Sequence, residues 1–297
     1  MKVDKRIKIG IYGPIYHTNL LVNQINNIGG KFYAKNVINN RFSHDCDVYH
    51  GIHAFLSKRF VFTKLFGKKN ICHWIGTDVF KIINNKNLQK LRYFLDRFIN
   101  VNVAVTQTLI NELRGIGINS KLIPIVTDFN NIKIFPLPKK FTVLTYIPHH
   151  RLNFYNFEII LSLIKKNPEI QFLILANSGE GMPKYDNVKY IKWCENILKY
   201  YYQSTVILRI PKHDGLSLTV LEALSCGRQI IWNYLFPHCH YSSSDLDSIQ
   251  SILEKIRKNP ELNVEGSNYV KENFSITKVV ENNLFNLYNE VLNKSVT

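Results

Sequence analysis

The feature that most constrains the fold is an alternation of short apolar runs with helix-spaced segments, which occurs twice along the 297 residues. The apolar runs are continuous, as expected of parallel strands that are buried on both faces of a sheet. A stretch with two prolines, residues 135–140, separates the two series. We therefore predict two α/β domains, each a doubly wound parallel sheet, with the boundary between residues 137 and 138.

Apolar periodicity and the glycines and prolines that end each segment define the expected elements. Two helices, 244–260 and 275–294, are expected to close the chain, and residues 53–67 to form an amphipathic helix. Strands are expected at 7–12, 45–51, 70–76, 101–106 and 121–128, and then at 141–147, 170–177, 188–193, 206–210 and 229–232.

Composition narrows the class of protein. With 45% hydrophobic residues the chain can bury a full core, which excludes disorder as a description of the whole. We find no uncharged apolar run of about 18 residues and no signal-peptide pattern at the start, so we expect a soluble, unsecreted protein. The five cysteines are odd in number and lack a C-x-x-C pair, which is typical of free thiols in a reducing compartment. These features predict a cytoplasmic location.

Positive charge is concentrated in the first half of the chain. Residues 1–140 hold 22 Lys and Arg against 7 Asp and Glu, a net charge of +15, whereas the remainder holds 16 against 15. Such a field favours a polyanionic partner: nucleic acid, an anionic bilayer or a phosphorylated acceptor. Simple solubility would also account for it. Residues 53–69 combine four phenylalanines with five Lys and Arg and are the candidate membrane contact.

Ligands of open parallel sheets bind beyond the carboxyl ends of the strands, so the loop at 211–217 is a candidate site. Asp214 follows an expected strand, Gly215 permits close approach of the backbone to a ligand, and Ser217 is a plausible helix N-cap. The free N–H groups of that helix start suit a diphosphate. Glu222 lies further along the same helix, flanked by apolar residues.

Segment 209–232 resembles glycosyltransferases of the GT-B fold, and family 4 in particular, which carry the pattern E-G-x-x-x-x-x-x-E-A-x-x-x-G. Here the acidic pair is Asp214 and Glu222, followed by Ala223 and Gly227, and the first acid is Asp instead of Glu. The resemblance implies two Rossmann-like domains that face a central cleft. It also implies that Glu222 binds the ribose of a nucleotide and that Asp214 and its loop contact the sugar.

Other segments agree with this resemblance. Residues 73–79 resemble the acceptor-side loop of the family, and Gly13 matches the glycine of its first loop. Residues 188–209 resemble the stretch where the nucleotide base binds, and 276–297 a helix that crosses back to the first domain. The implied domains are therefore 1–137 for the acceptor and 138–275 for the nucleotide-sugar.

The family usually places an Arg and a Lys after the first strand of its second domain to neutralise the leaving diphosphate. Arg151 is the candidate for the Arg, and no Lys follows at the usual spacing; Arg209 or Lys212 could supply the second charge, although each also fits a solvated surface. The position of His73 in the sequence also fits a buried histidine of the core, and that of His213 also fits a structural contact within the loop. The predicted catalytic residues are Asp214, Glu222, Arg151 and His73; the donor-binding residues are Gly13, His213, Gly215, Leu216, Ser217, Leu218, Arg209, Lys212 and Trp193; and the acceptor-side residues are Gly76, Thr77 and Asp78.

The resemblance implies a retaining, metal-independent hexosyltransferase that moves a sugar from a nucleotide-diphosphate sugar to a hydroxyl acceptor. We expect no cofactor and no metal, because the D-x-D pairs at 45–47 and 245–247 lack the setting of the metal-dependent fold. The expected partners are the donor, a glycan or lipid-linked acceptor, and an anionic membrane surface on the cytoplasmic side. The alternatives are a nucleic-acid-binding protein, a sugar-nucleotide epimerase and an inactive GT-B-like protein.

Overall fold

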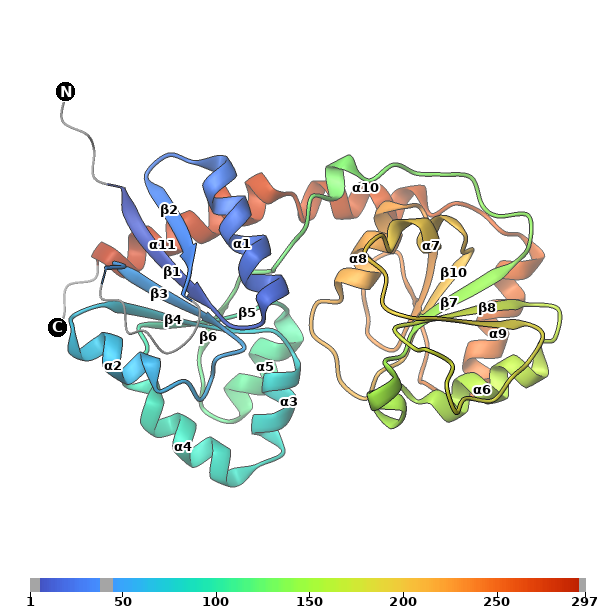
Figure 1. The fold of residues 1–297 in the computed structure, drawn as a ribbon, viewed down its shortest axis with the longest axis horizontal. Coiled ribbons are helices and arrows are strands. Elements are labelled where there is room, and N and C mark those ends of the chain that lie inside the picture. The colour runs from blue at the N-terminus through green and yellow to red at the C-terminus, as the bar shows by residue number, and fades with distance from the viewer. Residues whose placement is uncertain (1–5, 38–44, 294–297) are drawn as a thin grey trace. The chain divides into compact units, whose positions relative to one another are not determined.

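A computed structural model describes residues 6–37 and 45–293 of the chain (Figure 1). Residues 1–5 of the basic start and residues 294–297 of the expected last helix lie outside this range. The chain forms two compact units, the first within Met1–Thr127, His213–Leu216 and Phe274–Thr297, and the second within Asp128–Lys212 and Ser217–Asn273.

The first unit is built on a six-stranded parallel sheet with the order β2-β1-β3-β4-β5-β6. Helices α1 and α11 cover one face and α2 to α5 the other (Figure 1). The strands are β1 (Ile7–Tyr12), β2 (Phe32–Asn36), β3 (Val48–Ile52), β4 (Lys69–Trp74), β5 (Val101–Ala104) and β6 (Ser120–Leu122). The helices are α1 (Ile15–Ile28), α2 (Arg59–Leu65), α3 (Thr77–Ile83), α4 (Lys86–Asp96), α5 (Gln107–Gly115), the π-helical η3 (Thr277–Leu284) and α11 (Phe285–Asn293).

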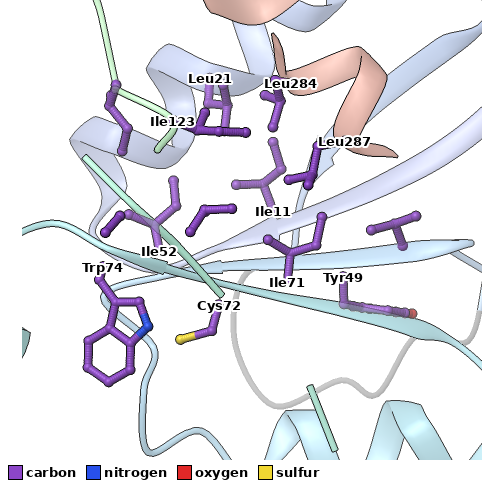
Figure 2. Packing of buried hydrophobic residues seen from close by; sticks show 14 of the residues in the cluster. Ile11, Leu21, Tyr49, Ile52, Ile71, Cys72, Trp74, Ile123, Leu284 and Leu287 are labelled. Carbon is purple, nitrogen blue, oxygen red and sulfur yellow. The ribbon is translucent and has the colours of Figure 1, made fainter. Parts of the chain in front are cut away.

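The end of the chain is part of the first hydrophobic core. Leu284 and Leu287 pack over the sheet beside Leu21 and Ile11 (Figure 2). The opposite face of the sheet carries Trp74, which is fully buried. Because both faces of the sheet are covered, consecutive residues of its central strands β3 and β4 are buried.

The second unit has its own parallel sheet, ordered β12-β11-β10-β7-β8-β9. One face packs against α6 and α9, and α7, α8 and α10 lie on the other (Figure 1). The strands are β7 (Thr142–Tyr146), β8 (Gln171–Leu175), β9 (Val188–Ile191), β10 (Val206–Arg209), β11 (Gln229–Trp232) and β12 (His240–Tyr241). The helical segments are η1 (Phe129–Asn131), η2 (His149–Tyr155), α6 (Phe157–Lys166), α7 (Leu198–Tyr202), α8 (Leu218–Ser225), α9 (Leu246–Lys258) and α10 (Val264–Asn273).

Residues 128–137, which were predicted to end the first domain, belong to the second unit. The fully buried guanidinium of Arg228 accounts for this placement. It donates hydrogen bonds to the backbone carbonyls of Phe135, of Pro136 at 3.3 Å and of Ser204 at 3.2 Å. The proline-rich stretch is therefore bound to the second unit instead of forming a free linker.

The helix expected at 53–67 is shorter than predicted. Residues 53–58 form a loop in which His53 has a left-handed φ of 53°, and α2 begins only at Arg59. Phe55 and Phe60 are buried, at 6% and 0% exposure, so the prediction that they belong to a surface patch is wrong. Their apolar rings fill space beside Trp74 and Tyr12.

Two further properties bear on the sequence predictions. None of the helices in the described part of the chain is both long and apolar enough to span a membrane. All five cysteines are free; Cys46, Cys72 and Cys226 are buried, and Cys194 and Cys239 are partly buried.

Candidate functional site

The predicted residues form two sets, one in each unit. Asp214 lies in His213–Leu216, which belongs to the first unit, and Glu222 lies on α8 in the second. Both residues follow β10 in the sequence. Each set is described within its own unit.

In the first unit, Asp78 organises the turn that follows β4. Its carboxylate is fully buried and accepts hydrogen bonds from the backbone N–H groups of Ile75, Gly76 and Val79 at 2.8 to 3.2 Å. Burial raises the pKa of Asp78, and the nearby His53 and then the three donors oppose that rise. Asp78 therefore shapes the predicted acceptor-side loop from within.

Three glycines allow backbone segments of the first unit to approach one another closely. A Cβ on Gly215 would lie 2.1 Å from the carbonyl oxygen of Ile75, and a Cβ on Gly76 2.9 Å from the nitrogen of Gly215. Similarly, Gly13 has a φ of +140°, and its Cβ would lie 2.1 Å from the carbonyl oxygen of Ile52. At these three positions a neighbouring backbone segment leaves no room for a side chain, so the fold itself requires glycine. The sequence predicted instead that the backbone would approach a ligand there.

His213 anchors its loop to the first unit. Its Nε2 lies 3.2 and 3.0 Å from the two carboxylate oxygens of Glu112 on α5, and its ring lies 5.1 Å from that of Phe80. Leu216 packs against the first core, and Asp214 accepts a bond of 3.1 Å from the N–H of the next residue. These contacts hold the loop in place, and a sugar contact by His213 or Asp214 stays a prediction.

His73 lies inside the first unit, in a hydrogen-bonded chain. Its Nε2 donates to the carbonyl oxygen of Ile123 at 2.9 Å, so its Nδ1 accepts, from Nε2 of His50 at 3.0 Å. His50 Nδ1 in turn accepts from the Tyr288 hydroxyl on α11 at 2.8 Å. Burial lowers the pKa of His73 to about 4 and that of His50 well below its usual value. Since both rings are neutral and fully engaged, this placement favours a structural role for His73.

Two other histidines, which no sequence motif marks, lie at this edge of the sheet. His53, after β3, places its Nε2 3.2 Å from the hydroxyl of Thr77. Burial, and then the proximity of His53, lower the pKa of His17 in the first turn of α1. No spacing pattern marks either residue in the sequence, so only the fold shows that both lie near the predicted acceptor-side loop.

In the second unit, Glu222 lies one turn into α8. The helix begins at Leu218, and the Ser217 hydroxyl accepts from the N–H of Val220 at 3.3 Å, which confirms the predicted N-cap. Oε2 of Glu222 accepts a 2.9 Å hydrogen bond from the buried hydroxyl of Tyr201 on α7. Burial raises the pKa of Glu222 to about 7, and the Tyr201 bond lowers it. The ionisation of this carboxyl therefore changes across the neutral pH range.

The three predicted cations gather around η2. The guanidinium of Arg151 lies 5.6 Å from the ring centroid of Tyr155, and that of Arg209 lies 5.8 Å from the same ring. The ammonium of Lys212 donates to Oδ1 of Asn153 at 2.6 Å. Aromatic faces attract and orient guanidinium groups, so Tyr155 of η2 holds the two arginines. Asn153 of the same segment holds the lysine, and three positive charges therefore gather after β7 and β10. This arrangement suits a diphosphate.

The predicted base-binding residue Trp193 follows β9 and is 78% exposed. Its indole is therefore open to a ligand, although contact with a base stays a prediction. Nearby, the structure brings together two residues that the sequence did not mark. Nδ1 of His149 lies 3.4 Å from Oδ1 of Asn177, and both residues follow parallel strands.

Candidate metal ligands are dispersed. Asp45 pairs with Lys35, and Asp245 caps α9 by accepting from the N–H of Ser248 at 2.8 Å. Within residues 6–37 and 45–293, no three His, Cys, Asp or Glu side chains are grouped so that they could hold a metal ion.

No family model matches the sequence, and no curated protein matches it. Solved structures match the whole fold. Anabaena HepE in complex with UDP and glucose has a TM-score of 0.78 at 10% identity, covering 96% of this chain and 100% of that chain. Sucrose-phosphate synthase from Thermosynechococcus elongatus gives 0.74 at 13% identity, and a glycosyltransferase from Rickettsia africae gives 0.68 at 12%; each match covers 98% of this chain and 100% of the other. The chain therefore has the GT-B fold, with two six-stranded parallel sheets covered by helices.

Proposed function

We propose that the chain is a retaining glycosyltransferase that moves a hexose from a nucleotide-diphosphate sugar to a hydroxyl acceptor without a metal ion. The observation that carries the proposal is that the second unit holds both the Glu222 carboxylate on α8 and three cations around η2. A carboxylate suits ribose hydroxyls, and cations suit the diphosphate. Because HepE has been solved with UDP, uridine is the first base to test. Family 4 membership is part of this proposal.

The same residues suggest how the reaction is accelerated. The barrier lies in breaking the anomeric bond while negative charge grows on the leaving diphosphate, so preorganised positive groups contribute most. Arg151, Arg209 and Lys212 supply three such charges, and the N–H groups at the start of α8 supply partial ones. The leaving phosphate removes the acceptor proton, and no protein base is assigned.

The donor site is tested by thermal-shift titration with the diphosphates of uridine, guanosine, adenosine and thymidine. At about 100 times its dissociation constant, the correct nucleotide stabilises the protein by ~2.7 kcal/mol. Glu222→Ala should abolish that shift, because it removes the acceptor of the ribose hydroxyls. Glu254→Ala is the matched control, since this exposed glutamate lies on α9 at the other face of the sheet.

The outcomes separate the alternatives. A shift with one nucleotide that Glu222→Ala abolishes supports the donor site and identifies the base. Absence of a shift with all four would contradict the proposal and favour an inactive protein. Retardation of DNA or RNA in a gel at physiological salt would favour nucleic-acid binding instead.

We further propose that the acceptor is lipid-linked and that the first unit binds an anionic membrane surface in the cytoplasm. The outer face of α4 supports this proposal, because its only acid, Asp96, pairs with the buried Arg92 at 3.1 Å. On the same side of the sheet (Figure 1), Leu65 and Phe66 at the end of α2 are 74% and 52% exposed. The exposed residues of α4 and its C-cap include Lys86, Lys90, Leu91, Tyr93, Phe94 and Arg97.

Flotation with anionic vesicles tests this partner. Each basic residue near anionic lipid contributes about 1 kcal/mol, so Lys86→Glu with Lys90→Glu should reduce the vesicle-bound fraction at least tenfold at low salt. Lys255→Glu with Lys258→Glu on α9 in the second unit makes the same charge change and should leave binding intact. Wild-type protein that stays in the soluble fraction at low salt would contradict the proposal.

A further inference from the structure

Helix α7 is a single short segment whose one buried residue is Tyr201. The neighbouring tyrosines, Tyr200 and Tyr202, are both partly exposed. Tyr202 packs its ring on that of Phe135 at 4.3 Å, whereas the ring of Tyr201 is fully buried in the second unit and its hydroxyl reaches Glu222 on α8. This selection points to a specific task for one residue of a three-tyrosine run.

The hydroxyl of Tyr201 is fixed from two directions. It donates to Oε2 of Glu222 at 2.9 Å, and it also hydrogen-bonds the side chain of Thr219 one turn earlier on α8. Burial, together with the Glu222 carboxylate, raises the pKa of Tyr201 well above its usual value, so the phenol keeps its proton and remains a donor. The bond occupies Oε2 and leaves Oε1 of Glu222 to accept from a bound molecule.

Other titratable groups on the elements packed against α8 are arranged differently. In the part of the chain that the structure describes, Tyr201 is the one side chain that hydrogen-bonds Glu222. Burial raises the pKa of Cys226, the C-cap of α8, to about 12, so its thiol stays neutral near pH 7. The remaining titratable and charged groups on these elements are Lys199, Tyr200 and Tyr202 on α7, Arg209 on β10, Asp128 before η1, Arg228 before β11, and Glu265, Tyr269, Lys271 and Glu272 on α10.

We propose that Tyr201 is a positioning residue, which holds the Glu222 carboxylate so that its second oxygen accepts hydrogen bonds from the ribose of the donor nucleotide. This inference rests on the proposed function. Because donor binding then requires an ionised and oriented Glu222, affinity should rise with pH through the neutral range. Loss of the Tyr201 hydroxyl should move that rise to higher pH, since the bond favours the ionised carboxylate.

The test is calorimetric titration with UDP between pH 6 and pH 9 on wild type, Tyr201→Phe and Tyr200→Phe. Tyr201→Phe should weaken UDP binding about fivefold at pH 7, which corresponds to a shift of roughly one pH unit in the titration of Glu222, and much less at pH 9. Tyr200→Phe also removes one phenol hydroxyl, but from the adjacent, partly exposed ring, so its UDP affinity should match that of wild type at every pH. A loss that is equal at every pH, or no loss, would overturn the assignment.

A double-mutant cycle between Tyr201→Phe and Glu222→Gln separates the interaction of the two side chains from general effects of either substitution on folding. In a Glu222→Gln background the amide does not ionise, so adding Tyr201→Phe should cause no pH-dependent change in UDP affinity. Direct titration of the Glu222 carboxyl by NMR, without nucleotide, should show a higher pKa in Tyr201→Phe than in wild type. If UDP fails to bind wild type, the NMR titration still distinguishes the positioning role of Tyr201 from the proposed nucleotide site. A higher Glu222 pKa in Tyr201→Phe would then contradict only the nucleotide site. An unchanged Glu222 pKa would contradict the positioning role as well.

Discussion

Acidification from pH 7 to pH 5 should destabilise the first unit by ~2 kcal/mol through His73 alone. The folded pKa of His73 is about 4, below the ordinary value near 6.5, because its ring is buried and because the nearby His17 also disfavours its protonation. Between these values the unfolded chain binds more protons, so stability is present above pH 6.5 and is lost as the pH falls toward 4. Burial shifts the pKa of His50 in the same direction, which adds to the loss.

Urea unfolding at pH 5, 6 and 7, followed by amide exchange of β3 and β4, measures this effect in the first unit. Two units can unfold separately, so a single global transition would not isolate it. His73→Gln removes the titrating ring. It should therefore reduce the stability lost between pH 7 and pH 5 by ~2 kcal/mol, even if it lowers stability at pH 7. His150→Gln, at an exposed position of the second unit, should keep the wild-type slope. Equal stability at pH 7 and pH 5 in wild type would refute the account.

The sequence predicted central strands better than edge strands. Central strands such as β3, β4, β7 and β10 are buried at nearly every position, because both of their faces are covered, and each contains adjacent apolar residues that the sequence shows. The strands it missed, β2 and β12, each lie at an edge of a sheet. In β2 only Phe32 and Ala34 are buried, and in β12 neither residue is, so no continuous apolar run marks these strands.

Candidate residues were predictable where a local signal exists. Ser217 precedes an apolar helix and caps it, and Glu222 interrupts that apolar face. Tyr201 was not predictable, because nothing in a run of three tyrosines says which ring will point inward. His213 and Glu112 are 101 residues apart in sequence, and only the fold brings them together. Local chemistry thus marked the acids and the caps, whereas the partners that orient them depend on the fold.

The largest single-residue effect is expected from Gly13→Ala, which should destabilise the first unit by about 3 kcal/mol or more. A Cβ at this position would lie 2.1 Å from the carbonyl oxygen of Ile52, far inside van der Waals contact. That oxygen is part of the backbone at the end of β3, so no rotamer change relieves the overlap. In addition, the φ of +140° is one that L-residues rarely adopt. Urea unfolding with amide exchange of β1 and β3 measures the loss.

Gly115→Ala provides the matched control. This glycine ends α5 in the same unit, its φ lies outside the left-handed region, and no atom lies within 4 Å of a built Cβ. Because alanine restricts the unfolded chain without a clash here, Gly115→Ala should be neutral or stabilise the unit by up to about 1 kcal/mol. If Gly13→Ala instead keeps full stability and weakens only UDP binding, Gly13 is a ligand contact, as the sequence resemblance implied. A loss of stability without nucleotide would show that close backbone packing requires this glycine.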